Sequence, residues 1–164
     1  MTNRKQLAPA ALAVAAFILV ACGGNAPSTT THDWSNPQTI HFADSLHIDL
    51  PSMTKTADGL YYKDIKEGTG EEVEAGDVAV VHYVGYLPNG KVFDKNTEPD
   101  TAYTFEMGIG RVIRGWDLGV QGMKKGGERL LVIPPDLAYG SKGADDAIPP
   151  NTTLVFDIKL VNVR

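Results

Sequence analysis

The hydrophobic pattern over the last two-thirds of the chain predicts short strands separated by glycine-rich turns. Residues 77–87 are rich in valine and tyrosine. Residues 128–134 contain an apolar run that stops at two prolines, and residues 153–161 alternate apolar with polar side chains. Residues 102–108 alternate in the same way. β-Branched and aromatic residues favour strands, and alternation is typical of a strand with one buried face. The pattern therefore predicts an antiparallel sheet.

A turn and a helix complete this pattern. Asn89 and Gly90 follow the first of these strands, and this pair predicts a hairpin turn. Ile113, Trp116 and Val120 recur at the spacing of one helix face. Glycines between them indicate that the helix is short. The expected fold class is α+β, with a twisted antiparallel sheet wrapped around one short helix.

The start of the chain has a different pattern. Arg4 and Lys5 precede an apolar run at residues 7–21, which is typical of a secretory signal. The run is short for a membrane span, which needs about 20 apolar residues. It ends in the sequence LVAC, and Cys22 is the only cysteine of the chain. This ending resembles a bacterial lipobox, which implies cleavage before Cys22 and lipid modification of Cys22.

Three regions follow from these patterns. Residues 1–21 are expected to be a lipoprotein signal peptide, and residues 58–164 the folded domain. Small and polar residues between them predict a flexible tether at 22–57. Within it, the alternation at residues 46–50 predicts a short added strand. Trp34 is expected to be exposed or loosely docked.

Charge and composition exclude several classes of function. The chain has 15 Lys and Arg against 20 Asp and Glu, a net charge of −5, which argues against binding nucleic acid. A single cysteine allows no disulfide within the chain. The four histidines lack metal-ligand spacing, and no nucleophile motif is present. We therefore expect no metal and no cofactor.

Aromatic residues carry the remaining signal. A buried tyrosine needs a hydrogen-bond partner, so aromatic residues that include three tyrosines on separate elements favour a partly open cavity over a plain core. The six residues are Tyr83, Phe93, Tyr103, Trp116, Tyr139 and Phe156. They occur in the strings VVHYVGYLPNGKVFDKN, FEMGIGRVIRGWDLGVQGMKKGGERLLVIPPDLAYG and IPPNTTLVFDIKLV. Together these strings resemble the FKBP-type peptidyl-prolyl cis–trans isomerases, over about residues 58–164 and in the family's order.

The resemblance implies an enzyme that accelerates rotation about Xaa–Pro bonds in exported proteins by binding the twisted amide without covalent chemistry. The catalytic residues that it implies are Tyr83, Phe93, Asp94, Trp116, Tyr139 and Phe156. The substrate-binding residues that it implies are Tyr103, Phe105, Val112, Ile113 and Ile148. For Phe105 and Phe156, plain core packing is an equal alternative. Asp94 is expected to accept a hydrogen bond from Tyr83, or else from local backbone N–H groups.

One loop departs from the family pattern. In GADDAIPP, Ala144 and Ala147 stand where many members carry larger side chains, and Asp145 and Asp146 add charge. Peptide preference and drug affinity are therefore open. A catalytically weak proline-peptide binding module or chaperone is the main alternative, and a purely structural surface lipoprotein is the third.

The expected partners follow from the resemblance and the lipobox. They are proline-containing polypeptides, macrolides such as rapamycin, and a membrane reached through lipid on Cys22. The protein is expected to be a monomer. It is expected to be exported and anchored to the bacterial cell envelope, at the outer membrane or the periplasmic face in a Gram-negative cell.

Overall fold

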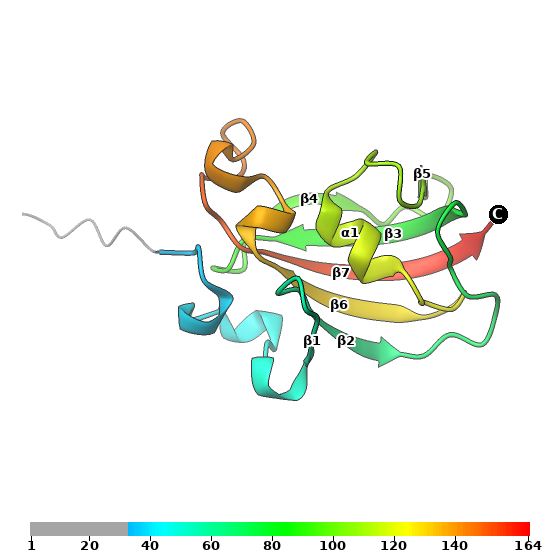
Figure 1. The fold of residues 1–164 in the computed structure, drawn as a ribbon, viewed down its shortest axis with the longest axis horizontal. Helices are drawn as coiled ribbons and strands as arrows, with labels where there is room; N and C mark the ends of the chain where they lie inside the picture. Colours follow the sequence, from blue (N-terminus) through cyan, green and yellow to red (C-terminus); the bar gives the residue numbers. More distant parts are fainter. Residues whose placement is uncertain (1–32) are drawn as a thin grey trace, which may run out of the picture. The chain divides into compact units, whose positions relative to one another are not determined.

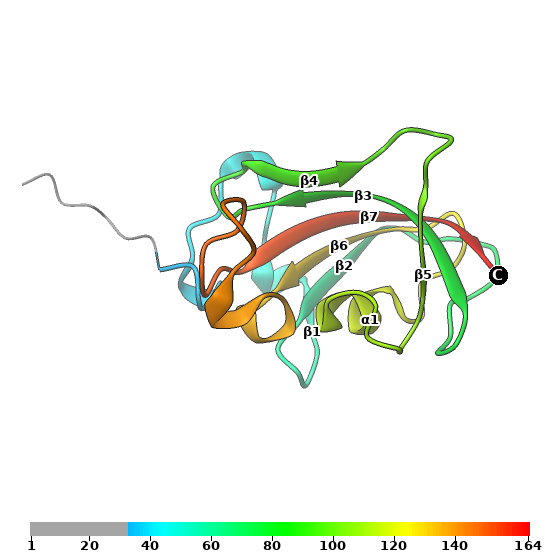
Figure 2. The same cartoon turned by 90° about the horizontal axis from the view of Figure 1, so that it is seen from above.

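The computed structural model describes residues 33–164, in which a seven-stranded antiparallel sheet curves around one α-helix (Figures 1 and 2). The strands are β1 (Thr54–Lys55), β2 (Tyr61–Lys66), β3 (Val78–Tyr86), β4 (Val92–Asn96), β5 (Tyr103–Glu106), β6 (Glu128–Ile133) and β7 (Leu154–Val163). The helix is α1 (Arg114–Val120). Five short 3₁₀ helices lie at Pro37–Thr39, Asp44–Leu46, Leu50–Ser52, Pro135–Leu137 and Gly140–Lys142. The expected α+β fold class is confirmed.

The long strands β7 and β3 form the centre of the sheet, whose order is β1-β2-β6-β7-β3-β4. One edge of β3 is shared by two partners. Residues 78–81 of β3 pair with β5, whereas residues 83–86 pair with β4. Tyr83 is thus the first residue of β3 to pair with β4. The loop between β3 and β4 contains the expected turn, with Gly90 at a positive φ of 83°.

Two glycines let α1 lie close against the sheet. A Cβ atom on Gly119 would stand 2.6 Å from Leu131 Cδ1, and one on Gly115 would overlap the side chain of Ile133. Both neighbours belong to β6. A side chain at either position would force the Leu131 or Ile133 side chain to move, so glycine allows the close approach of helix and sheet. Trp116 is buried on the same helix, as the hydrophobic spacing predicts.

The segment before the sheet packs on the sheet face opposite α1. Leu131 of β6 belongs to the cluster that contains Trp116, whereas its neighbour Val132 belongs to a second cluster with Leu46 and Met53. Successive strand residues point to opposite faces. Residues 42–53 therefore cover the outer face of β2, β6 and β7.

This arrangement corrects the expected tether over its described part. Residues 46–50 are not a strand, because a 3₁₀ helix ends at Leu46 and His47 adopts a left-handed φ of 50°. The added strand is β1, which pairs with β2. Consecutive tight turns can also place alternate apolar residues on one surface. The alternation in residues 46–50 therefore did not by itself distinguish such turns from a strand. Trp34 packs against the main core, and its carbonyl accepts a 2.8 Å hydrogen bond from the Thr153 N–H.

The predictions for the signal peptide, Cys22 and residues 22–32 lie outside the described residues. Within residues 33–164, no helix has the length and apolar character needed to cross a membrane.

Candidate functional site

A cavity of about 430 Å³ opens between α1, β3, β4 and the segment that precedes α1. The residues that line it are Tyr83, Phe93, Asp94, Tyr103, Arg111, Val112, Ile113, Trp116, Tyr139 and Phe156. Nine of these ten are site residues expected from the sequence. Arg111 is the tenth, and no sequence argument singled it out.

Trp116 stands at the centre of the aromatic lining. Its ring meets Tyr83 edge to face at 4.9 Å between centroids, and Phe156 at 5.3 Å. Phe156 in turn meets Phe93 edge to face at 5.5 Å. Edge-to-face pairs are the favoured contacts of aromatic rings. The short helix α1 therefore holds Trp116 against rings from β3, β5 and β7, and these rings fix the shape of the cavity.

Two expected site residues lie outside the lining. Phe105 is 3% exposed and packs against Trp116 at 5.4 Å, so the core-packing alternative holds for it. Ile148 is 4% exposed and belongs to the core. Its N–H and C=O both pair with the backbone of Ala144, which closes the intervening loop. Phe156 is equally buried but does line the cavity, so packing and lining are combined in one side chain.

A hydrogen bond joins two walls of the cavity. The Tyr83 hydroxyl donates to Asp94 Oδ2 at 2.7 Å, as expected from the sequence. Burial, and then the Asp94 carboxylate, raise the pKa of Tyr83 well above its ordinary value of 10. Burial, followed by Asp94 and Tyr103, also raises the pKa of Tyr139. Both hydroxyls therefore stay protonated at neutral pH and can donate hydrogen bonds.

Several donors around the cavity have no acceptor within residues 33–164. They include the Tyr139 hydroxyl, the Ile113 backbone N–H and the buried Nε1 of Trp116. Tyr139 is 40% exposed, so its hydroxyl is accessible to a ligand. An apolar hollow with a few donors at its edge suits a ligand that combines an apolar ring with carbonyl oxygens. In the same residues, no cluster of His, Cys, Asp or Glu is arranged to hold a metal.

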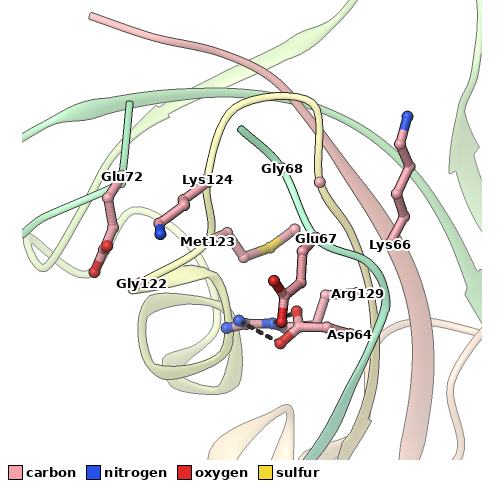
Figure 3. Close-up of a pocket in the computed structure, with 10 residues that line it drawn as sticks. Asp64, Lys66, Glu67, Gly68, Glu72, Gly122, Met123, Lys124 and Arg129 are labelled. Carbon is pink, nitrogen blue, oxygen red and sulfur yellow. Dashed lines mark hydrogen bonds and ion pairs between the residues drawn. The ribbon is translucent and has the colours of Figure 1, made fainter. Parts of the chain in front are cut away.

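A second, polar hollow of about 210 Å³ lies beside the other end of α1 (Figure 3). Arg129 is its most connected residue: Nε and Nη2 bond the two carboxylate oxygens of Asp64 at 2.6 and 3.1 Å. Nη1 donates to the carbonyls of Gly119 and Gln121 at 3.0 and 3.2 Å, and the guanidinium lies over the Tyr62 ring. Arg129 thus ties the last turn of α1 to β2 and β6.

Comparison with known proteins decides the family. The family model described as "FKBP-type peptidyl-prolyl cis-trans isomerase" matches residues 69–161. An "FK506-binding protein" from Neisseria meningitidis serogroup B is 45% identical over 105 residues, which cover 64% of this chain and 96% of that protein. The chain belongs to the FKBP-type peptidyl-prolyl isomerase family. The family predicted from the sequence motifs is confirmed.

Other relatives of this FKBP-type chain differ in length. The "FK506-binding protein 4" of Rhizopus delemar is 51% identical over 112 residues, which cover 68% of this chain and 29% of that protein. The chain spans between 23% and 30% of the length of four such curated relatives. The crystal structure of a peptidyl-prolyl cis-trans isomerase from Pseudomonas syringae is similar with a TM-score of 0.62 and 42% identity, covering 69% of this chain and 81% of that one.

Proposed function

We propose that this FKBP-type chain is a peptidyl-prolyl cis–trans isomerase that accelerates rotation about Xaa–Pro bonds in exported proteins. The observation that carries the proposal is the aromatic cavity centred on Trp116, with unpaired donors at its edge. The pyrrolidine ring of proline is apolar and compact, and it packs well against aromatic faces. Peptide carbonyls on either side of the ring are natural acceptors for the edge donors.

The reaction needs no bond to be made and no proton to move. Rotation breaks amide resonance, with a barrier of about 18–20 kcal/mol, and takes tens to hundreds of seconds without a catalyst. Reaching the millisecond range requires a rate increase of roughly 10⁴–10⁵, or about 5.5–7 kcal/mol. The twisted amide has lost charge separation, so an apolar cavity stabilises it more than the planar ground state. This difference in binding is what accelerates the rotation.

Each wall has a role in this mechanism. Trp116 and its aromatic neighbours hold the proline ring. The Tyr139 hydroxyl and the Ile113 N–H donate to substrate carbonyls and hold the preceding carbonyl in its rotated position. Asp94 accepts from Tyr83 and fixes that ring as a wall, so its role is positional.

The direct test measures isomerisation of Xaa–Pro tetrapeptides by purified residues 23–164, with and without rapamycin. Catalysis that rapamycin blocks supports the isomerase and the aromatic cavity together. Catalysis without inhibition supports the isomerase and assigns the difference in drug affinity to the loop at residues 140–148. Proline-peptide binding by the folded protein without any rate enhancement contradicts the proposal and favours the binding module or chaperone.

We also propose that the protein is exported and anchored to the cell envelope through lipid on Cys22. The basic start, the apolar run and the LVAC sequence support this proposal. The described residues begin at Asp33, so ten residues, 23–32, would separate them from the anchor. Ten residues span at most about 35 Å, which sets the longest possible distance between Cys22 and the start of the described domain.

The lipid anchor is tested by labelling with a radioactive fatty acid in a bacterial host and by fractionating the cells. We expect label and membrane association in the wild-type protein, and neither in Cys22→Ala. Membrane association that survives this substitution contradicts the anchor and leaves the isomerase proposal untouched.

A further inference from the structure

Arg111 lies where the segment between β5 and α1 reaches the aromatic cavity. It lines the cavity and its side chain is exposed. The segment is held at its start, because the Met107 N–H donates to the Asp77 carbonyl at 2.8 Å and the Gly108 N–H donates to Asp117 Oδ1 at 2.9 Å. Its other end leads directly into α1. The backbone of Arg111 is therefore attached to fixed structure on both sides.

The guanidinium of Arg111 has no partner within residues 33–164. The two ion pairs in this part of the chain join Arg114 to Asp58 and Arg129 to Asp64. Arg111 makes no hydrogen bond or ion pair there. A guanidinium offers five N–H donors and always carries its charge. Arg111 thus presents an uncommitted cation at the edge of an apolar cavity.

Other charged groups near the cavity do not compensate this cation. Asp94 is the one carboxylate among the lining residues, and it accepts the hydrogen bond from Tyr83. Asp145 and Asp146 are exposed in the loop at residues 140–148 and are not part of the lining. A carboxylate that arrives with a peptide therefore meets Arg111 as the free charge of opposite sign.

We propose that Arg111 is a specificity-determining residue, which selects proline segments that carry an aspartate or glutamate next to the isomerised Xaa–Pro bond. The inference rests on the proposed isomerase function and names its preferred substrate class. A carboxylate bound to a guanidinium forms a charge-assisted hydrogen bond, which is stronger than a neutral one. The chain carries a net charge of −5, so long-range attraction does not favour acidic peptides. The preference must therefore arise from local contact.

The test compares kcat/KM for pairs of Xaa–Pro tetrapeptides that differ only by glutamate against glutamine, placed before or after the proline. The ratio of the two values cancels errors in enzyme concentration and in the folded fraction. At low salt we expect a glutamate preference of about two- to five-fold in at least one position, the size of an exposed ion pair. The preference should shrink as salt is raised, because salt screens exposed charges.

Charge variants assign the preference to one residue. In Arg111→Gln the ratio should fall to about one, and in Arg111→Glu it should fall below one. Arg114→Gln is the matched control: it loses the same charge three residues away, from a side chain that pairs with Asp58 and does not line the cavity. Its ratio should equal that of the wild-type protein.

Two results overturn the inference: a wild-type ratio of one at low salt in both positions, or a preference that Arg111→Gln retains. Absence of catalysis on every peptide would be a failure of the proposed function instead. In that case the same peptide pairs are compared by affinity, through titration of tryptophan fluorescence, and the same ratios decide the role of Arg111.

Discussion

The two arginines that line the hollows beside α1 differ in their hydrogen bonding. In the polar hollow, the three nitrogens of the Arg129 guanidinium all donate within the protein, to Asp64 and to two carbonyls at the end of α1. In the aromatic cavity, Arg111, Tyr139 and the Ile113 N–H have no acceptor in the described part of the chain. Paired polar groups stabilise a structure, whereas unpaired donors that face an opening can bind a ligand. Arg129 therefore supports the fold, whereas the unpaired donors of the aromatic cavity can bind a ligand.

The two regions are joined through α1. Arg129 bonds the carbonyl of Gly119, three residues after Trp116. The same glycine lets the helix lie against Leu131. The position of Trp116 in the cavity therefore depends on contacts made in the polar hollow. Substitutions in the two regions should separate stability from catalysis.

The largest effect is expected for Trp116→Ala. Removing a buried tryptophan costs about 3–5 kcal/mol of unfolding free energy, and here it also removes the centre of the cavity. We expect loss of most of kcat/KM, measured on the fraction that urea denaturation shows to be folded. Trp116→Phe keeps an aromatic ring and should retain part of the activity. Full activity in a folded Trp116→Ala protein contradicts the role of Trp116.

Arg129→Met should affect mainly stability. The substitution leaves the carbonyls of Gly119 and Gln121 without this donor and removes the partly buried ion pair to Asp64, which together should cost about 1–3 kcal/mol of unfolding free energy. Urea denaturation measures the loss. Lys124→Met removes a cation of the same hollow that has no side-chain partner in residues 33–164, and its unfolding free energy should stay within about 0.5 kcal/mol of the wild-type value. Equal stability of the two variants would show that Arg129 does not support α1.

Tyr139→Phe removes one donor from the cavity and should affect mainly catalysis. A neutral hydrogen bond contributes about 1 kcal/mol, so kcat/KM should fall about five-fold. Stability should hardly change, because the hydroxyl has no acceptor in residues 33–164. Tyr86→Phe makes the same change next to the cluster on the opposite sheet face and is the control. An unaltered kcat/KM in Tyr139→Phe removes the donor role.

The smallest effect is expected from pH. Among residues 33–164 no histidine lines the cavity, and the raised pKa values of Tyr83 and Tyr139 keep both hydroxyls protonated. The rate should therefore be nearly flat from about pH 6 to 8. An inflection near pH 6.5 in kcat/KM would indicate a titrating group that the mechanism lacks.

The same pKa shifts predict a change in stability at high pH. Tyr83 has a higher pKa in the folded protein than its ordinary value of 10, so the unfolded chain loses this proton first. The stability that Tyr83 contributes is complete below about pH 10 and is lost as the pH rises above 10 towards the folded pKa. Tyr139 acts in the same direction. Urea denaturation at pH 8 and pH 10.5 should show less loss of stability in Tyr83→Phe than in the wild-type protein.

Local patterns in the sequence were enough to predict β3, the turn after it, β5, β6, β7, the short helix and the family, whereas they predicted neither β2 nor the position of β1. The sequence also indicated nine of the ten residues that line the cavity. These features depend on local pattern: alternation marks strands, helical spacing marks α1, and the family motifs are continuous strings. The hydrogen bond from Tyr83 to Asp94 was predicted for the same reason, because both residues stand in one string on paired strands.

Other features could be found only in the folded structure, because they depend on contacts between residues that are distant in the sequence. Phe105 and Ile148 turn into the core, while Arg111 joins the cavity because the segment before α1 is held there. Residues 42–53 look like a tether, yet they are ordered because the sheet offers an apolar outer face for them to cover. Arg129 is an ordinary charged residue in the sequence, and only the folded chain brings Asp64 and the end of α1 to it. At these positions burial and pairing depend on residues that are far apart in the sequence, so the local pattern around each residue does not predict them.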